Sequence, residues 1–529
     1  MLNNFMKSYY AFYVAFIQSS IFYKLSLDKR GGIFAPSKFI TDPWPGDINN
    51  GKIILNGNIL NDSSTMQLEL IDFLIYKPIC IEFHECAKYA NSFFWIRDLQ
   101  AIGGNSCRRY ARKLISFFID SYRKEKRFWK RDCQWTSVVL GERLCNWVFS
   151  YSFVAAGASD EFQKKFLSSL CEQYSHLLKS YKAETNLCSK IIALKGLIFC
   201  QCVMRNINIG VLNKFIMKLN QLVEENFDKY GMIITRNPVD EFNLFRSLIE
   251  IRFIIKNLNM DIIENFFSDK LSRMASCIRF LRLGDGCLSS FQGDSNSSTS
   301  FIIPTRQIID AAISVVNAKL TNEQKLVSGF DRLSTKKIAV IVNTSISEVK
   351  SKFNHYSEPG INIFDFESSF GISRVIYRSD ISILSNGYRI KVHPNSQNFS
   401  KKDITESGIF FKGESVSQTS NFFLAIRREL FINANIAQLS GSDFVSIQGK
   451  FLTIVRLVLN EKCSISKVNE KTIMITIEQK QYKLTVLVGH NIREIIIRTE
   501  FNYPSVEFEL ENGKSDNVQI KWSLEQVEN

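Results

Sequence analysis

The sequence predicts an α+β chain of two domains, a helical domain followed by an antiparallel β-sandwich. Two observations predict it. Between about residues 85 and 325 the apolar residues recur three or four positions apart, which is the spacing of one helix face. After about residue 330 they alternate with polar residues, as in half-buried strands. Helices first and strands afterwards indicate two separate domains rather than a mixed α/β sheet.

Residues 1–84 are expected to form an extension with its own helix. The apolar stretch from Tyr9 to Phe22 is interrupted by Gln18, Ser19 and Ser20, which predicts an amphipathic helix and argues against a cleaved secretory signal. It is also short and polar for a membrane span. An uncleaved export signal is the alternative. Further on, DPWPGDINNG is rich in turn residues, and KIILNGNIL predicts a short strand or hairpin.

The predicted helical domain covers residues 85–325. Its apolar faces include Leu114, Phe117, Phe118 and Tyr122 in one helix, and Leu144, Trp147, Val148 and Tyr151 in the next. Short polar breaks separate these helices. We therefore expect an all-α arrangement up to a link at 317–330, NAKLTNEQKLVSGF.

The stretch YGMIITRNPVDEFNLFRSLIEIRF (230–253) predicts the start of one of these helices. Asn237 is the expected N-cap, Pro238 the first helical residue, and Asp240 an acid in the first turn. The apolar residues that follow at helical spacing predict one buried face: Leu244, Leu248, Ile251 and Ile255. This account leaves Arg236 unexplained.

The predicted β-sandwich covers residues 326–529. Alternation is clear in Ile473, Ile475 and Ile477, in Tyr482, Leu484, Val486 and Val488, and in Val506, Phe508 and Leu510, followed past Asn512-Gly513 by Val518, Ile520, Trp522 and Leu524. Antiparallel strands joined by tight turns account for this pattern.

Composition limits the partners and cofactors. The formal net charge of +14 favours a polyanion such as nucleic acid, an anionic membrane or an acidic polysaccharide, although a general richness in Lys gives the same sign. No long Lys/Arg block of a nucleic-acid arm is found, so nucleic acid is not expected. The twelve cysteines show no paired metal-type spacing and no compact disulfide framework, which predicts buried thiols, no metal site and no cofactor.

Several stretches, taken in order, resemble the heparinase II/III family in its alphaproteobacterial branch. ANSFFWIRDLQAI (90–102) is similar to the family's Leu-His-Gly-Phe-x-Trp-Leu-Arg-His-Leu segment, and WKRDCQWTSVVLGERLCNWV (129–148) to its Trp-rich helix pair with Arg-Leu. YGMIITRNPVDEFNLFRSLIEIR (230–252) resembles Asp-Gly-Gly-His-x-x-Arg-Asn/Ser-Pro, and FLRLGDGCLSSFQG (280–293) resembles Gly-Asp-Gly-x-Leu-x-x-Phe-x-Gly. AIRRELFI (425–432) and VQIKWSLEQ (518–526) look like strands of its β domain.

The resemblance implies an incomplete (α/α) toroid followed by a β-sandwich. It also implies a carbon–oxygen lyase that cleaves an acidic, uronate-containing polysaccharide by β-elimination in a cleft between the domains. In that chemistry a cation or amide neutralises the carboxylate, a base removes the neighbouring proton, and an acid protonates the leaving oxygen.

Under this resemblance Arg236 or Asn237 faces the sugar carboxylate at the start of a helix, where backbone N–H groups also favour an anion. The competing interpretations are structural. Asn237 is an N-cap by the same side chain, and Arg236 has possible ion-pair partners in Glu241 and Glu250.

The acid and base are harder to assign, because positions where the family has His hold Asn91, Ile233 or Ile234, and Ile426, and Asp240 stands where it has Tyr. The candidates are Asp240 or Glu241 as base, Tyr230 as acid, and His355, which precedes Tyr356 in a loop. A dipole role for Asp240 and a solvated loop for His355 are the alternatives.

The candidate substrate-binding residues are Asn91, Trp95, Trp135, Arg143 and Arg427. Tryptophan at helical spacing is more often packed in a core, and this alternative applies to three of the four tryptophans at 95, 129, 135 and 147, with Trp135 the exception to watch. Arg143 is either a carboxylate ligand or an ion-pair partner near Glu142. Of Arg427 and Arg428, one is expected to point outward from a strand.

The sequence thus predicts a heparinase-like lyase that acts on an anionic polysaccharide, with no integral membrane span. A catalytically degenerate glycan-binding or envelope-assembly protein of the same fold is the alternative, and a general interaction scaffold is a third. The resemblance favours the cell envelope or periplasm, whereas the weak signal and the unpaired cysteines favour the cytoplasm.

Overall fold

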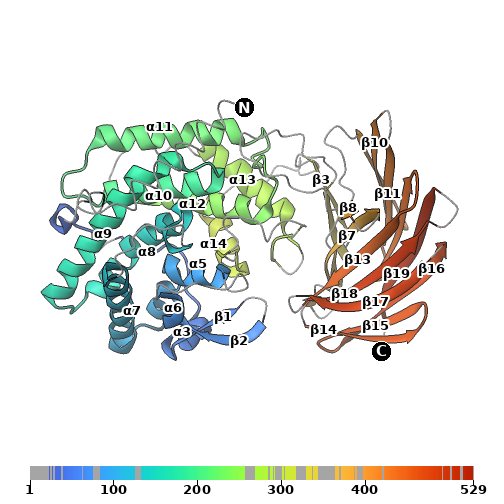
Figure 1. Ribbon diagram of the computed structural model, residues 1–529, viewed down its shortest axis with the longest axis horizontal. Helices are drawn as coiled ribbons and strands as arrows, with labels where there is room; N and C mark the ends of the chain where they lie inside the picture. The colour runs from blue at the N-terminus through green and yellow to red at the C-terminus, as the bar shows by residue number, and fades with distance from the viewer. Residues whose placement is uncertain are drawn as a thin grey trace. The chain divides into compact units, whose positions relative to one another are not determined.

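The protein is described by a computed structural model (Figure 1). The structure describes Tyr23, Leu27, Phe291, Phe301 and Ile302 as single positions, together with residues 30–36, 40–61, 64–74, 84–124, 133–256, 268–283, 286–289, 304–316, 329–335, 338–343, 364–368, 371–373, 375–385, 388–389, 397–419, 422–460, 462–490, 492–500, 503–512 and 516–527. The expected N-terminal helix, Trp129, most of the 317–330 link and His355 lie outside the described residues.

The chain forms two compact units. The first comprises Met1–Phe227, Asp240–Ala275 and Asn296–Ala318, and the second Asp228–Val239, Ser276–Ser295 and Lys319–Asn529. The division is therefore not a single cut near residue 325, because two segments from within the helical half of the sequence belong to the second unit.

Helices dominate the described residues before 317, as the 3.6-residue period predicts. They are α3 (Ile48–Leu55), α4 (Leu70–Leu74), α5 (His84–Ser92), α6 (Ile96–Ile102), α7 (Gly104–Lys124), α8 (Ser137–Ala155), α9 (Asp160–Ser180), α10 (Leu187–Cys202), α11 (Ile209–Asn226), α12 (Pro238–Lys256), α13 (Ser268–Leu281) and α14 (Arg306–Val316), with single turns η1 (Gly31–Ile33), η3 (Cys133–Trp135) and η4 (Tyr181–Ala183). KIIL is the end of α3, not a strand, and the following residues form β1 (Asn58–Asn61) against β2 (Ser64–Glu69).

Helix α12 is more deeply buried than its apolar pattern predicts. Leu244, Leu248, Ile251 and Ile255 are buried as expected, but so are the polar side chains of Asn243, Arg246, Ser247 and Glu250 between them. A helix buried on all sides must satisfy its polar groups inside the protein.

Helices α8 and α10 touch backbone to backbone. A Cβ atom added to Gly141 would lie 2.5 Å from the Ile192 carbonyl oxygen, and one added to Gly196 would lie 2.9 Å from the Gly141 Cα. Only glycine permits this approach, because backbone cannot move aside as a flexible side chain can.

We expect Gly141→Ala to lower the free energy of unfolding by about 1–3 kcal/mol through overpacking. Gly210→Ala is the matched control, since its nearest neighbour, Asn208 Oδ1, would be 3.4 Å from the new Cβ. Thermal unfolding followed by circular dichroism measures both. Equal stability of the two variants would contradict the backbone contact.

The second unit is built from antiparallel strands (Figure 1). Eight form one sheet in the order β14 (Cys463–Asn469), β15 (Thr472–Ile477), β16 (Lys480–His490), β19 (Asn517–Val527), β12 (Gln438–Ile447), β11 (Phe422–Asn433), β10 (Gly408–Thr419) and β9 (Gln397–Thr405). A second sheet has five strands in the order β17 (Ile492–Glu500), β18 (Tyr503–Glu511), β13 (Leu452–Leu459), β7 (Ile376–Ser385) and β8 (Tyr388–Arg389). A third sheet has four strands in the order β3 (Phe330–Ser334), β4 (Ile338–Asn343), β5 (Phe364–Ser368) and β6 (Gly371–Ser373).

The predicted alternation is confirmed in β15, β16, β18 and β19, whose apolar residues share one buried core. One expected turn is wrong. Strands β18 and β19, on either side of Asn512, belong to different sheets and do not form a hairpin. Instead the Asn512 side chain accepts a hydrogen bond from Phe451 N at 3.0 Å and donates to the Gly449 carbonyl at 2.6 Å, so it ties β18 to the start of β13.

A buried ion pair links the two larger sheets. Arg428 on β11 pairs with Asp443 on β12 and donates to Ser379 Oγ on β7 at 2.7 Å, while Trp522 Nε1 donates to Asp443 Oδ2 at 3.0 Å. The preceding residue, Arg427, faces outward with its guanidinium carbon 4.7 Å from the centroid of the Phe444 ring. Opposite faces for the two arginines were expected, but both lie within β11 rather than before it.

Candidate functional site

The candidate site is the segment from Asp228 to Asp240, which leads into α12. It begins with a tight turn in which Asp228 Oδ1 accepts hydrogen bonds from Tyr230 N at 2.8 Å and Met232 N at 2.9 Å. Gly231, with φ of 87°, supplies the left-handed residue that this turn needs. The turn leaves the Tyr230 side chain 37% exposed, whereas Met232 and Ile233 are buried.

Arg236 has a strained backbone. Its φ is 55°, in the left-handed region, and its N–H donates to the Ile233 carbonyl at 3.0 Å to close a second turn. For a non-glycine residue this conformation costs about 1 kcal/mol or more. Strain of this kind persists where the surrounding structure enforces it, and it clusters at functional sites.

Asn237 acts as the predicted N-cap of α12. Its Oδ1 accepts a hydrogen bond from Val239 N at 2.9 Å. A carboxylate ligand would instead be bound by the amide N–H groups, so capping and anion binding use different atoms of this side chain. Asp240 and Glu241 in the first turn are buried, with Asp240 6% exposed, which leaves little surface for a substrate to reach.

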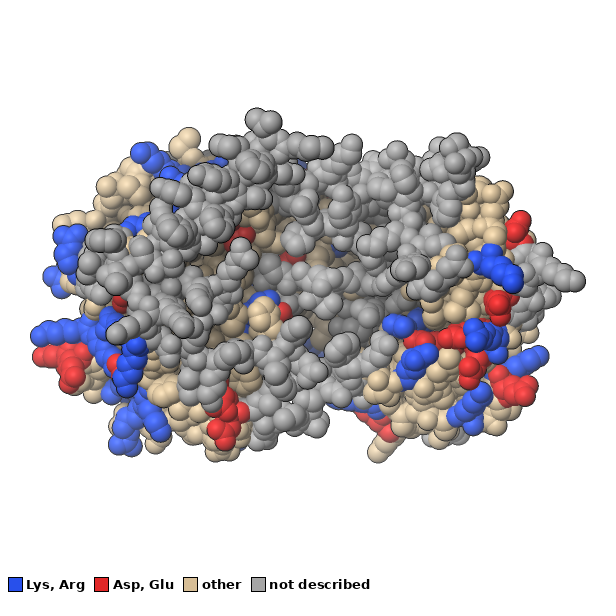
Figure 2. Space-filling view, viewed as in Figure 1, with Lys and Arg blue, Asp and Glu red and all other residues tan. Residues whose placement is uncertain are grey.

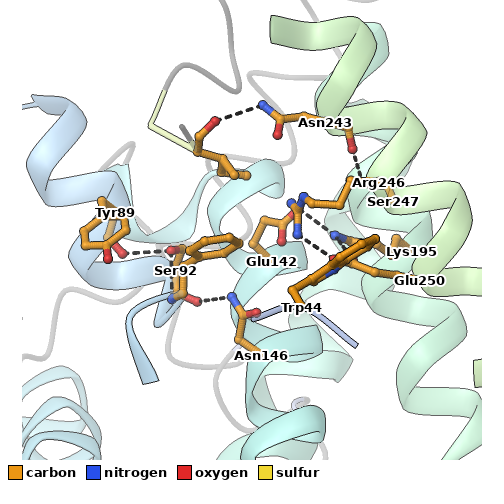
Figure 3. A network of polar contacts seen from close by, with 12 residues as sticks. Trp44, Tyr89, Ser92, Glu142, Asn146, Lys195, Asn243, Arg246, Ser247 and Glu250 are labelled. Carbon is orange, nitrogen blue, oxygen red and sulfur yellow. Dashed lines mark hydrogen bonds and ion pairs between the residues drawn. The ribbon is translucent and has the colours of Figure 1, made fainter. Parts of the chain in front are cut away.

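A buried ionic network holds α12 in place (Figure 3). Lys195 Nζ on α10 lies 2.6 Å from Glu142 Oε1 on α8 and 2.7 Å from Glu250 Oε2 on α12. Arg246 lies 3.0 Å from Glu142 Oε1 and 2.5 Å from Glu250 Oε1. Two cations and two carboxylates balance, and all four side chains are at most 1% exposed.

Glu250 stays ionised because of this pairing. Burial alone would raise the pKa of Glu250, but Arg246 and Lys195 outweigh it and lower that pKa to about 2. Burial likewise opposes the charge on Lys195, yet Glu142 and Glu250 raise the pKa of its ammonium group. The network is therefore structural. It fixes the helix at whose N-terminus the candidate site lies.

The network continues into the segment before α3 and into α6. Trp44 Nε1 donates to Glu250 Oε1 at 2.6 Å, and Asp42 pairs with Arg97 at 3.0 Å. Burial raises the pKa of Asp42, although Arg97 opposes the shift. The Arg97 guanidinium carbon lies 3.5 Å from the centroid of the Phe94 ring, an arrangement that suits a buried cation.

Three predicted substrate-binding residues, Asn91, Trp135 and Arg143, come together in a second buried cluster. Arg143 Nη1 donates to the carbonyls of Asn91 at 2.8 Å and Gln134 at 2.9 Å, and Nε donates to Gln173 Oε1 at 2.6 Å. The guanidinium carbon lies 5.0 Å from the centroid of the Trp135 ring. Arg143 is fully buried, and among the described residues it has no carboxylate partner. Burial lowers the pKa of Arg143 to about 9.

His176 also belongs to this cluster, and no sequence pattern predicts it. It lies on α9, its Nδ1 is 2.9 Å from the Tyr23 hydroxyl, and its ring meets Trp135 edge to face. Burial, with help from Arg143 and Lys179, lowers the pKa of His176 to about 3, so the imidazole is neutral. No local sequence pattern predicts this environment, because the two neighbours of His176, Tyr23 and Trp135, come from distant parts of the chain.

The remaining candidates are dispersed. Trp95 is fully buried, donates to the Ala90 carbonyl at 2.9 Å and packs on Phe93, so its role is packing, as it is for Trp147. Arg427 lies on the β-sheet. The ion pair considered between Arg236 and Glu250 is not formed, because Glu250 bonds Arg246, Lys195 and Trp44.

Metal and membrane features can be stated for the described residues. Their His, Cys, Asp and Glu side chains form no group of three that could hold a metal ion. Their helices include none with the length and apolar character needed to cross a bilayer. None of their cysteines forms a disulfide, and all but Cys287 are buried.

Comparison by sequence gives one relative with a name. No family model matches the chain. The chain is 25% identical over 299 residues to FtsZ-localized protein C of Caulobacter vibrioides, a match that covers 56% of this chain and 49% of that protein. The chain thus spans about half the length of the curated relative that it matches.

Comparison by structure identifies the fold. A crystal structure of heparinase III superposes with a TM-score of 0.62 at 10% identity, covering 94% of this chain and 87% of the other. A heparan sulfate lyase of Pedobacter heparinus gives a TM-score of 0.47 at 11% identity, covering 98% and 88%. At such identities the heparinase III match shows the architecture alone, a helical toroid followed by a β-sandwich.

Proposed function

We propose that the protein binds an acidic, uronate-containing polysaccharide at the Asp228–Asp240 segment and cleaves it by β-elimination. The observation that carries the proposal is the left-handed backbone of Arg236, a strained cation directly before the N-cap of a long, rigidly held helix. The fold shared with heparinase III supports the same class of substrate by analogy.

The chemistry assigns one role to each group. The Arg236 guanidinium and the Asn237 amide N–H groups neutralise the uronate carboxylate, at the end of α12 where the helix dipole is positive. This acidifies the proton on the carbon that carries the carboxylate. The Tyr230 phenolate takes that proton, the electron pair forms a carbon–carbon double bond, the bond to the glycosidic oxygen breaks, and the phenol returns the proton to the leaving oxygen.

Tyr230 is preferred over the acidic candidates because of exposure. It is 37% exposed, whereas Asp240 and Glu241 are buried in the first turn of α12. A group that exchanges protons with a polymer must reach it. His355, the other candidate, lies outside the described residues.

Binding without cleavage is the second candidate function. The chain has five histidines, none between His176 and His355, and His176 is buried and neutral. An enzyme of this type commonly needs an imidazole as base or electrophile. The name of the relative, FtsZ-localized protein C, states a location and no reaction.

The location we propose is the bacterial cell envelope, where acidic polysaccharides are found. The relative is named for its localisation with FtsZ, and that name is the second support for this location. Cell fractionation with an antibody against the natural protein tests this. Recovery in the envelope fraction is expected, and recovery only with cytoplasmic markers would contradict it.

The function is tested by ultraviolet absorbance, because β-elimination creates an unsaturated uronate that absorbs. Purified protein is incubated separately with alginate, hyaluronan, chondroitin sulfate and heparin. We expect absorbance to rise with at least one polymer and the rise to be lost in Tyr230→Phe. Binding of a polymer by wild-type protein without any absorbance would instead establish the second candidate function.

Arg236→Gly is expected to change stability and binding in opposite directions. Glycine adopts the left-handed conformation without strain, so thermal stability should rise by about 1 kcal/mol. Loss of the guanidinium should weaken polymer binding by about tenfold or more. Arg236→Lys is the control that keeps the charge and the strain. A variant that is stabilised and still binds like the wild type would remove Arg236 from the site.

A further inference from the structure

Helix α7 carries an unusual concentration of positive charge. Its 21 residues contain six basic side chains and one acidic one, a net charge of +5. Four of the six occur in the run Arg108-Arg109-Tyr110-Ala111-Arg112-Lys113. Residues four apart lie one turn apart on the same side of a helix, about 6 Å along its axis. The run therefore forms two adjacent rows, Arg108 with Arg112 and Arg109 with Lys113.

These charges are not compensated by carboxylates. Arg112 donates to the carbonyls of Val154 at 2.7 Å, Ala156 and Gly157 at the end of α8, and Arg108 donates to Asn105 Oδ1 at 3.1 Å. Within the part of the chain that the structure describes, none of the four cations is in an ion pair. Burial lowers the pKa of Arg112, and the positive charge of the neighbouring Arg108 adds to this shift.

The orientation of the rows is fixed. The opposite side of α7 is buried through Cys107, Ala111, Leu114, Ile115, Phe118, Ile119 and Tyr122. At the other end of the helix, Lys165 of α9 pairs with Asp120 at 2.7 Å and Arg123 with Glu172 at 3.4 Å. Helix α7 therefore cannot rotate to hide its cations, and Arg109 and Lys113 remain exposed.

The surface can be followed in Figure 2, where basic side chains gather at the lower left, over the part of the first unit occupied by α7. By contrast α11, another amphipathic helix of this unit, has two basic and two acidic residues and no net charge. The excess is thus a property of α7 and not of every exposed helix.

The exposed face of α7 carries positive charge but no exposed aromatic or large hydrophobic side chain. Its aromatic residues, Tyr110, Phe117, Phe118 and Tyr122, are buried or half-buried, so none presents an open ring for stacking on a nucleic-acid base. No large hydrophobic residue of α7 is exposed. A partner must therefore be held through anionic groups spaced along an extended chain.

We infer that the α7 basic rows bind the carboxylate or sulfate groups of an acidic polysaccharide through the exposed Arg109 and Lys113, while the half-buried Arg108 and Arg112 add positive charge behind them. These rows form a second contact with the polymer, apart from the Asp228–Asp240 segment. Arg guanidinium groups fit carboxylate and sulfate oxygens in pairs, and Lys113 adds a point charge. The inference takes its polymer class from the proposed function but requires no cleavage.

The test uses two matched variants of the full chain. Arg109→Gln/Lys113→Gln removes two exposed charges four residues apart from α7. Lys214→Gln/Lys218→Gln removes two charges at the same spacing from α11, where Lys214 is exposed and Lys218 half-buried. The dissociation constant for fluorescein-labelled heparin is measured at low and at physiological salt, with thermal unfolding confirming that each variant is folded. DNA oligonucleotides and anionic phospholipid vesicles serve as competing probes.

We expect the α7 variant to bind heparin about tenfold more weakly at low salt, with a shallower salt dependence, and the α11 variant to stay within about twofold of the wild type. Equal losses in the two variants, no loss in either, or α7-dependent binding that is stronger for DNA or vesicles would overturn the inference. If the wild-type protein cleaves the polymer and the α7 variant binds heparin as the wild type does, only the inference about α7 is refuted. Binding that depends on α7, without cleavage, refutes only the proposed lyase reaction.

Discussion

Lys195→Met should destabilise the helical unit by about 3–5 kcal/mol, because it leaves two carboxylates buried with a single remaining cation. Lys195 Nζ lies within 2.7 Å of both Glu142 and Glu250, and all of these side chains are buried. Methionine keeps much of the volume, so the loss measures charge rather than a cavity.

Lys190→Met on the same helix is the control, because Lys190 is only half-buried and binds the Glu184 carbonyl at 3.2 Å. Chemical denaturation of both variants gives the comparison. A Lys195→Met cost no greater than that of Lys190→Met would mean that the network does not hold α8, α10 and α12 together.

The same network gives a pH dependence with a defined sign. The pKa of Glu250 is lowered from 4.5 to about 2 by its partners. A carboxyl group with a depressed folded-state pKa contributes stability that is fully present above 4.5 and is lost as the pH falls through about 2. The penalty of Lys195→Met should also shrink on acidification, because a protonated Glu250 no longer needs a cation.

Arg428→Met should destabilise the β-sandwich by about 3–5 kcal/mol, since Asp443 would remain buried with only the Trp522 N–H as a donor among the contacts described above. The pair also joins β11 to Ser379 on β7 of the facing sheet, at 2.7 Å. The loss should therefore appear as reduced cooperativity between the two sheets as well as a lower unfolding temperature.

Its neighbour provides the control. Arg427→Met removes a cation from the outward face of the same strand, where the guanidinium rests on Phe444. An exposed cation–π contact contributes about 0.5–1 kcal/mol. Similar unfolding temperatures for the two variants would contradict the structural role assigned to the buried pair.

The sequence predicts those parts of the fold that depend on the local spacing of apolar residues and on helix-capping residues. The helical half, the start of α12 with Asn237 and Pro238, and the alternating strands β15, β16, β18 and β19 all follow from patterns a few residues long. The prediction of a tight turn between β18 and β19 was wrong. The Asn512 side chain bonds to a segment about 60 residues earlier in the chain, and no local pattern reveals that contact.

The buried polar groups could not be paired from the sequence for the same reason. Lys195 is 53 residues from Glu142 and 55 from Glu250, so only Arg246 and Glu250, four apart, carry a local signal. Charged residues on helices usually face solvent, and nothing short of the fold shows that these do not. Likewise the left-handed backbone of Arg236 is a tertiary result, since Arg has no preference for it.

The most direct test of the account compares the rate of ultraviolet absorbance increase for wild-type protein and Arg236→Gly at equal concentrations of folded protein. The substrate is the polymer that gives the strongest wild-type signal. If Arg236 neutralises the substrate carboxylate, the wild-type rate should be at least about a hundredfold above that of the more stable variant. Equal rates, or no absorbance from the wild type with any of the four polymers, would contradict a lyase site at the Arg236-Asn237-Pro238 stretch.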